Sequence, residues 1–131
     1  MFLDASALIA IIAKEEDGTA LGARLAKATK AFTSPIAIYE ATLGLARIGK
    51  VSSSEAKVPL EHLLKSAKIE VKCIDKDTAD IALHAFLHFG KGRHPAALNM
   101  GDCFAYACAK QLGVPLLFKG DDFAKTDIEV A

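Results

Sequence analysis

The chain has 131 residues, of which 52% are hydrophobic and 24% charged, with 16 basic and 16 acidic side chains. This length and apolar content indicate one compact domain, residues 1–131, and exclude a chain that stays disordered. The longest apolar stretch stops at Lys14, far short of the about 20 residues that a membrane-spanning helix needs, and no basic segment precedes it as in a secretory signal. We therefore expect a cytoplasmic protein that does not bind membranes.

The balance of charge excludes binding of nucleic acid through a broadly basic surface, so such a partner would need a focused site or a metal. The cysteines form no C-x-x-C pair and leave an odd thiol, which supports neither a disulfide framework nor a zinc ribbon. We interpret all three as small buried hydrophobic residues: Cys73, Cys103 and Cys108.

Short apolar runs alternate with longer helical patterns, which is typical of α/β units around a mainly parallel sheet. The runs predicted to be strands are 1–3, 31–33, 69–73 and 115–118, with a weaker fifth candidate at 128–130. The helical patterns cover 5–13, 19–28, 35–48, a segment that begins after Ser52, 78–89 and 100–112.

Capping residues mark several helix starts. Ser34 precedes a proline, and Ser52 and Asn99 are each followed three residues later by an acid, the spacing of a capping box. Either Asp75 or Asp77 can cap the helix predicted at 78–89.

Asp4 directly follows the first predicted strand. In open α/β sheets, binding sites form beyond the carboxyl ends of the strands, and Asp4 lies at such an end. An isolated aspartate at this junction is more simply explained as the cap of the next helix. Acids elsewhere in the chain shift the interpretation toward a shared site.

Glu40 lies in the helix predicted at 35–48, which is apolar almost all round and carries only Glu40 and Arg47 as charges. Such a helix is normally buried, and no cation stands three or four residues from Glu40. A buried carboxylate without a partner is costly, so Glu40 must find a partner, raise its pKa or bind a metal.

Further acids lie at the ends of other elements. Asp102 stands at the third position of its helix, where it also suits a capping box with Asn99. Asp121 and Asp122 follow the strand predicted at 115–118, in a Gly-Asp-Asp segment that turn chemistry alone could explain. Cap and turn preferences do not explain why two strand ends, one apolar helix and one helix start each present an acid, whereas a shared site does.

Carboxylates within reach of one another raise at least one pKa unless a cation is present. Oxygen ligands suit Mg²⁺ or Mn²⁺, and Mg²⁺ takes one or two carboxylates together with waters and phosphate oxygens. Such an ion lowers the pKa of a bound water and stabilises charge on a phosphate. It would also reconcile a chain of zero net charge with a polyanionic substrate.

This ordered set of residues resembles PIN-domain ribonucleases, and in particular the VapC toxins of type II toxin-antitoxin pairs. The matching residues are Asp4 with Ser6, Glu40 within 34–41, Asp102 within 101–107, and the Gly-Asp-Asp-Phe segment 120–123. The resemblance extends over residues 1–127. It implies a three-layer α/β/α PIN-like domain with a mainly parallel five-stranded sheet.

The resemblance also implies a function: a toxin that cleaves single-stranded regions of RNA as an endonuclease dependent on Mg²⁺ or Mn²⁺. The catalytic acids, which would also bind the metal, are then Asp4, Glu40, Asp102 and Asp121. Ser6 would hydrogen-bond beside them. The expected partners are a cognate VapB-like antitoxin, operator DNA only as part of the toxin-antitoxin complex, and a second copy of the chain in a homodimer.

The last motif departs from the family pattern at Lys119, where the family often has Thr or Ser. The adjacent acids leave open which is the fourth; we favour Asp121, with Asp122 in a supporting position. Lys119 could contact an RNA phosphate or simply extend over the surface. Lys91 and Arg93, in the loop 90–95, are candidates for RNA contact, although a solvated connecting loop explains that composition equally well.

Other classes fit parts of the pattern. A receiver domain of a phospho-relay has similar acids and a lysine after its last strand, but its adjacent acids come early in the chain. A non-catalytic PIN-like interaction module would be expected to lack one of the four acids. His84 and His88 have the spacing of a helical zinc pair without the glutamate of that motif, so surface or interface histidines are the preferred interpretation.

Overall fold

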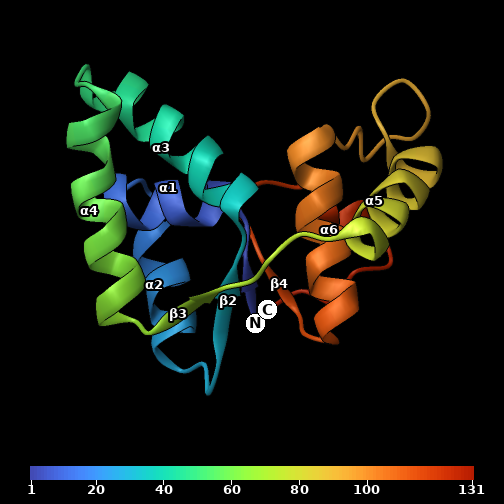
Figure 1. Ribbon diagram of the computed structural model, residues 1–131, viewed down its shortest axis with the longest axis horizontal. Helices are drawn as coiled ribbons and strands as arrows, with labels where there is room; N and C mark the ends of the chain where they lie inside the picture. The colour runs from blue at the N-terminus through green and yellow to red at the C-terminus, as the bar shows by residue number, and fades with distance from the viewer.

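The computed structural model describes residues 1–131 and places a parallel sheet between two layers of helices (Figure 1). The strands are short: β1 (Phe2–Leu3), β2 (Ala31–Thr33), β3 (Ile69–Val71) and β4 (Leu116–Leu117). They lie in the order β3-β2-β1-β4, and every neighbouring pair is parallel. This order places β1, and Asp4 directly after it, in the interior of the sheet.

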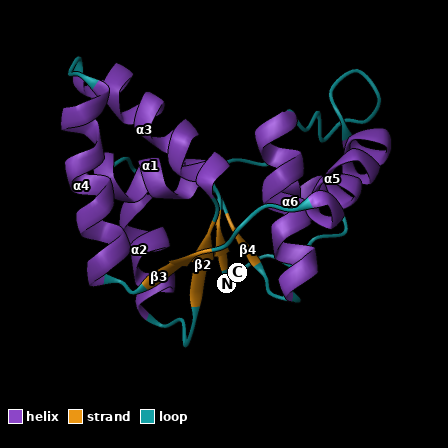
Figure 2. Ribbon diagram, in the orientation of Figure 1, coloured by secondary structure: helices purple, strands orange, loops and turns teal.

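The helices are α1 (Ala5–Ala13), α2 (Gly18–Ala26), α3 (Pro35–Gly49), α4 (Ser53–Ser66), α5 (Lys76–Phe89) and α6 (Met100–Leu112), and a 3-10 turn, η1, covers Phe123–Lys125. Figure 2 shows α1 to α4 on one side of the sheet and α5 and α6 on the other. The three-layer α/β/α arrangement predicted from the sequence is therefore confirmed. None of these helices combines the length and apolarity needed to cross a bilayer.

The sheet has four strands, where five were predicted. The segment 128–130 does run beside β4, but it pairs through a single parallel bridge between Val130 and Leu116. Its backbone bonds join Leu116 N to Glu129 O at 2.8 Å and Ala131 N to Leu116 O at 3.0 Å. The segment therefore adds a single bridge beside β4 and does not form a fifth strand.

The predicted caps form where the sequence placed them. The side chains of Ser34, Ser52 and Asn99 each accept a bond from a backbone N–H in the first turn of the following helix. Asp75, and not Asp77, caps α5, because its carboxylate accepts from Thr78 N at 2.9 Å. These caps determine where the helices that carry Glu40 and Asp102 begin.

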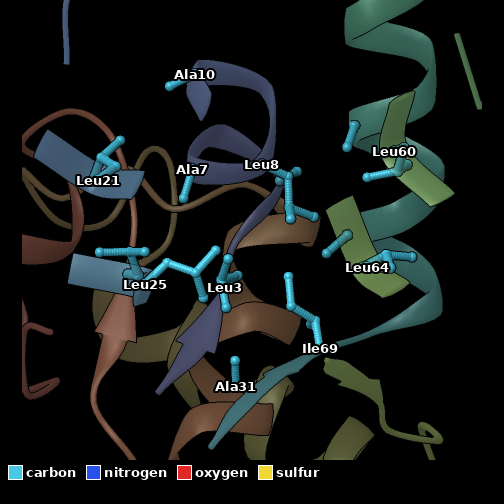
Figure 3. Close-up of a cluster of buried hydrophobic side chains, with 14 of the residues drawn as sticks. Leu3, Ala7, Leu8, Ala10, Leu21, Leu25, Ala31, Leu60, Leu64 and Ile69 are labelled. Carbon is cyan, nitrogen blue, oxygen red and sulfur yellow. The ribbon is translucent and has the colours of Figure 1, made fainter. Parts of the chain in front are cut away.

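Alternate residues of each strand face opposite helical layers, as the strand geometry requires. Leu3, Ala31, Ile69 and Leu117 pack toward α1 to α4, and in Figure 3 Leu3 and Leu8 lie between leucines of α2 and α4. Phe2, Phe32 and Leu116 pack toward α5 and α6. The sheet therefore separates two apolar cores, and β1 is fully buried between them.

Two sequence-based expectations about burial are wrong in part. Cys103 and Cys108 are buried, but Cys73 is exposed, since it follows β3 at the edge of the sheet, where only one strand pairs. The apolar helix α3 is not covered on all sides either. Its residues Tyr39, Leu43 and Ile48 are 65%, 46% and 49% exposed, because α1 and α4 cover only part of its circumference.

Candidate active site

Asp4 ends β1 and caps α1, so the site begins on the most buried strand of the sheet. Its backbone N–H bonds to Leu117 O at the end of β4, and its carboxylate accepts from the backbone N–H of Ser6 at 2.9 Å and from the Ser6 hydroxyl at 2.5 Å. Asp4 is 4% exposed and forms no ion pair. Burial raises the pKa of Asp4, and the bonds from Ser6 oppose that rise.

Ser6 joins the two strand ends that carry acids. While it donates to Asp4, its hydroxyl oxygen accepts a bond from the backbone N–H of Lys119 at 3.0 Å. The ammonium group of Lys119 pairs with Glu15 at 2.8 Å. Ser6 thus lies against Asp4 and the segment after β4, while the charge of Lys119 is directed to a neighbouring acid.

Glu40 projects from the second turn of α3 toward the first turn of α6. Its carboxylate lies against the backbone of Gly101: a Cβ atom built on Gly101 would lie 2.2 Å from each carboxylate oxygen. Burial raises the pKa of Glu40 to about 7, with further contributions from the negative charges of Asp4 and Asp102. The sequence predicted that Glu40 is buried without a paired cation. In the structure Glu40 is half-buried, lies near two other acids and has no paired cation.

Asp102 acts in a capping box and also faces the site. Its carboxylate accepts from Asn99 N at 2.9 Å, and its own N–H bonds to the Asn99 side chain at 3.0 Å. Burial raises the pKa of Asp102 to about 6, the Asn99 amide lowers it, and the charges of Asp4 and Asp122 raise it. Asp102 therefore takes part in the cap of α6 and also lies near the other acids, a combination that the sequence allowed.

Asp121 and Asp122 follow β4 but have different surroundings. The charge of Asp122 acts on Asp102, and its carboxylate lies 3.9 Å from the ammonium of Lys125. Asp121 instead lines a polar pocket with Arg24 of α2. The sequence favours Asp121 as the fourth acid, and that role stays a prediction; of the two acids, Asp122 is the one whose charge contributes to the pKa of Asp102.

The donor set fits a hard divalent cation in its chemistry. Asp4, Glu40 and Asp102 present only oxygen atoms, and no lysine, arginine or histidine pairs with them. No three His, Cys, Asp or Glu side chains stand close enough together to enclose a metal ion by themselves. Mg²⁺ does not require such an enclosure, because it commonly binds through one or two carboxylates and completes its shell with water and phosphate oxygens.

The basic loop 90–95 lies between α5 and α6 (Figure 1). Lys91 and Arg93 are exposed there, and the Arg93 guanidinium lies 5.4 Å from the centre of the Phe86 ring. Lys125 of η1 donates to Pro95 O at 3.4 Å. The loop therefore borders the segment that carries Asp122.

The two histidines of α5 lie on the surface, as predicted. His84 and His88 are exposed, and their rings stack with centroids 4.0 Å apart.

Gly101 is the residue of the site that the sequence analysis missed. The only signal for it in the sequence is a glycine in the first turn of a helix, directly before an acid, at a position where glycine is a poor helix former.

The chain thus has a central parallel sheet between helical layers, with acids directly after β1 and soon after β4. The family model described as "PIN domain" matches residues 1–129, and the chain belongs to this family. That membership excludes the receiver-domain alternative.

Curated proteins that resemble this chain show which group within the family it is similar to. The chain is 40% identical to "Ribonuclease VapC" of Mycolicibacterium smegmatis over 129 residues, which cover 98% of this chain and 97% of that protein. The resemblance to VapC ribonucleases found in the sequence is therefore confirmed.

Solved structures share the fold at lower sequence identity. The crystal structure of VapC20 of Mycobacterium tuberculosis, described as a sarcin-ricin loop cleaving toxin, matches with a TM-score of 0.78 and 15% identity, covering 99% of this chain and 97% of that one. A toxin-antitoxin complex from Klebsiella pneumoniae matches with a TM-score of 0.69 and 18% identity, covering 99% and 95%.

Proposed function

We propose that this protein is the toxin of a type II toxin-antitoxin pair and cleaves single-stranded regions of RNA as an endonuclease dependent on Mg²⁺ or Mn²⁺. One observation carries the proposal: Asp4, Glu40 and Asp102 come from three separate parts of the chain and have no paired cation, and the charge of Asp4 raises the pKa of both other acids. A divalent cation would supply that balance and would also attract a phosphate-containing substrate.

Asp4, Glu40 and Asp102 are the residues that would hold the ion, directly or through a bound water, with Asp122 or Asp121 as the fourth acid. When bound, the ion lowers the pKa of a water molecule and stabilises negative charge on the phosphate. The chain itself supplies orientation. Ser6 holds one oxygen of the Asp4 carboxylate through two hydrogen bonds.

RNA contact is proposed for the exposed Lys91 and Arg93, because their loop borders the segment that carries Asp122. Lys119 is a weaker candidate, because its ammonium would have to leave Glu15 first. That ion pair is partly exposed, so solvent screening weakens it and a phosphate could displace it.

The partner proposed is a VapB-like antitoxin, with operator DNA bound only by the toxin-antitoxin complex and the toxin itself forming a homodimer. The name of the relative and the toxin-antitoxin complex from Klebsiella pneumoniae support an antitoxin partner. The exposed apolar side chains of Tyr39 and Leu43 on α3, the helix that carries Glu40, offer a surface that a partner would cover.

The test is cleavage of a single-stranded RNA by the purified protein with Mg²⁺, with Mn²⁺ and with EDTA. Wild-type protein should cleave only with a divalent cation. Replacing a residue that hydrogen-bonds to a metal ligand typically lowers activity by about 10–100-fold. Asp4→Asn alters a proposed ligand itself and should lower cleavage by more than that. Asp80→Asn, which alters an exposed aspartate on α5, is the matched control and should cleave normally.

Cleavage that survives EDTA, or full activity in Asp4→Asn, would overturn the proposal. A PIN-like module without catalytic activity would show no cleavage under any of these conditions.

The fourth acid is tested by comparing Asp121→Asn with Asp122→Asn. Because the charge of Asp122 reaches Asp102, Asp122→Asn should cause the larger loss of cleavage. The opposite order would assign the role to Asp121.

A further inference from the structure

Glu40 and Gly101 are 61 positions apart in the sequence and touch across the gap between α3 and α6. The ideal Cβ position on Gly101 is only 2.2 Å from both carboxylate oxygens of Glu40 and 2.4 Å from its Cδ atom, where real Cβ atoms essentially never come within 3.0 Å of another heavy atom. Gly101 is buried. The Glu40 carboxylate therefore occupies the space that any other residue at position 101 would need for its side chain; we name this contact the carboxylate seat.

The glycine at position 101 is not explained by the stability of α6 itself. Gly101 is the second residue of that helix, and glycine is among the poorest helix formers. The helix already has a full capping box from Asn99 and Asp102. What glycine provides at this position is room for a charged group that arrives from another helix.

An added side chain at position 101 would meet the flexible end of Glu40, and Glu40 is only half-buried. Glu40 can move away without displacing any backbone, so the fold tolerates the change. To clear 3.0 Å the carboxylate must shift by about 0.8 Å or more. Misplacement of a catalytic group by about 1 Å can cost about 100-fold in rate.

We propose that Gly101 is a positioning residue for Glu40: the missing side chain lets the Glu40 carboxylate lie against the first turn of α6, next to Asp102. The inference rests on the proposed function, because it assigns Gly101 a role in the same metal site. It predicts a substitution that leaves the protein folded and disables the site.

The primary test is Gly101→Ala, measured by cleavage of RNA and by the Mn²⁺ concentration that gives half of the maximal rise in melting temperature. Cleavage should fall about 10–100-fold, and more Mn²⁺ should be needed. Gly22→Ala is the matched control, because this helical glycine has nothing within 4 Å of its Cβ position. It should leave cleavage and the Mn²⁺ requirement unchanged.

A second variant separates positioning from a general structural effect. Glu40→Asp shortens the side chain by one carbon–carbon bond, about 1.5 Å, which is enough to clear an alanine at position 101. Alone, Glu40→Asp withdraws the carboxylate from the carboxylate seat and lowers cleavage. Added to Gly101→Ala, it should cause no further loss or restore activity, whereas two independent residues would multiply their losses.

A third measurement needs no catalytic activity. With Glu40 replaced by alanine, Gly101→Ala meets no carboxylate and should raise the melting temperature as much as Gly22→Ala does. With Glu40 present, the same change should raise it less or lower it. An equal rise in both backgrounds, wild-type cleavage in Gly101→Ala, or multiplied losses in the double variant would overturn the inference. If wild-type protein cleaves no RNA, the proposed function fails, and this thermal comparison still decides whether the carboxylate seat exists.

Discussion

Replacing Glu40 with glutamine should stabilise the metal-free protein while it abolishes cleavage. Glutamine keeps the shape of the side chain on Gly101 but carries no charge. In the wild-type protein without a cation, the Glu40 carboxylate is partly desolvated and faces the negative charges of Asp4 and Asp102. Removing its charge relieves both costs.

The size of the effect follows from the pKa. In the folded protein the pKa of Glu40 rises from 4.5 to about 7. At about 1.36 kcal/mol per pKa unit this corresponds to about 3 kcal/mol, and solvent screening of a half-buried group reduces it to about 1.5 kcal/mol. For a chain of this length, that free energy raises the melting temperature by about 5 °C.

The direction of the pH dependence follows as well. Between pH 4.5 and 7 the folded protein holds a proton on Glu40 that the unfolded chain has released. The free energy of unfolding of the wild-type protein therefore falls as the pH rises through this window. Glutamine does not titrate, so the advantage of Glu40→Gln should be absent below pH 4.5 and complete at pH 8.

The assay is urea denaturation in EDTA, once below pH 4.5 and once at pH 8. The control is Glu61→Gln, which alters an exposed residue of α4. Mg²⁺ at pH 8 should reduce or reverse the advantage, because it binds the wild-type site and stabilises the folded state. Equal stability of Glu40→Gln and wild type at pH 8, or the same advantage at both pH values, would refute the reasoning.

Other expected outcomes concern orientation, metal binding and the core. Ser6→Ala should lower RNA cleavage by about 10–100-fold with little change in melting temperature, since it removes the hydroxyl that orients Asp4. Mg²⁺ should raise the melting temperature of the wild-type protein but not of Asp4→Asn, as a thermal scan with and without EDTA would show. In urea denaturation, Leu60→Ala should lose about 2–5 kcal/mol because Leu60 is fully buried, whereas the exposed Val58→Ala should change stability by less than about 0.5 kcal/mol.

Two helices could be predicted from the sequence to the residue, whereas α5 begins at Lys76, directly after its cap Asp75 and two residues before its predicted start. The bounds of α1 and α6 agree with the predicted 5–13 and 100–112, because capping residues at one end and a left-handed residue at the other mark where each helix begins and ends. Strand ends were less accurate. The strand predicted at 69–73 ends at Val71, because the last residue of β2, Thr33, already pairs with Val71.

The candidate acids could be named from the sequence because Asp4, Asp121 and Asp122 follow strands, Asp102 begins a helix, and Glu40 stands alone in an apolar helix. The contacts between their side chains could not be predicted from the sequence. The contact of Glu40 with Gly101, and the nearness of Asp122 to Asp102, depend on how separate elements pack against one another. Periodicity and capping describe each element by itself, so they contain no information about such contacts.

The order of the acids along the chain has a consequence for synthesis. Asp4 and Glu40 lie in the first third of the protein, whereas Asp102 and Asp122 are added after most of the chain has been made. The strand β4, which pairs with β1 and bonds to Asp4, also comes late. In a growing polypeptide on the ribosome, the proposed ribonuclease site would therefore stay incomplete until residue 122 has joined the chain.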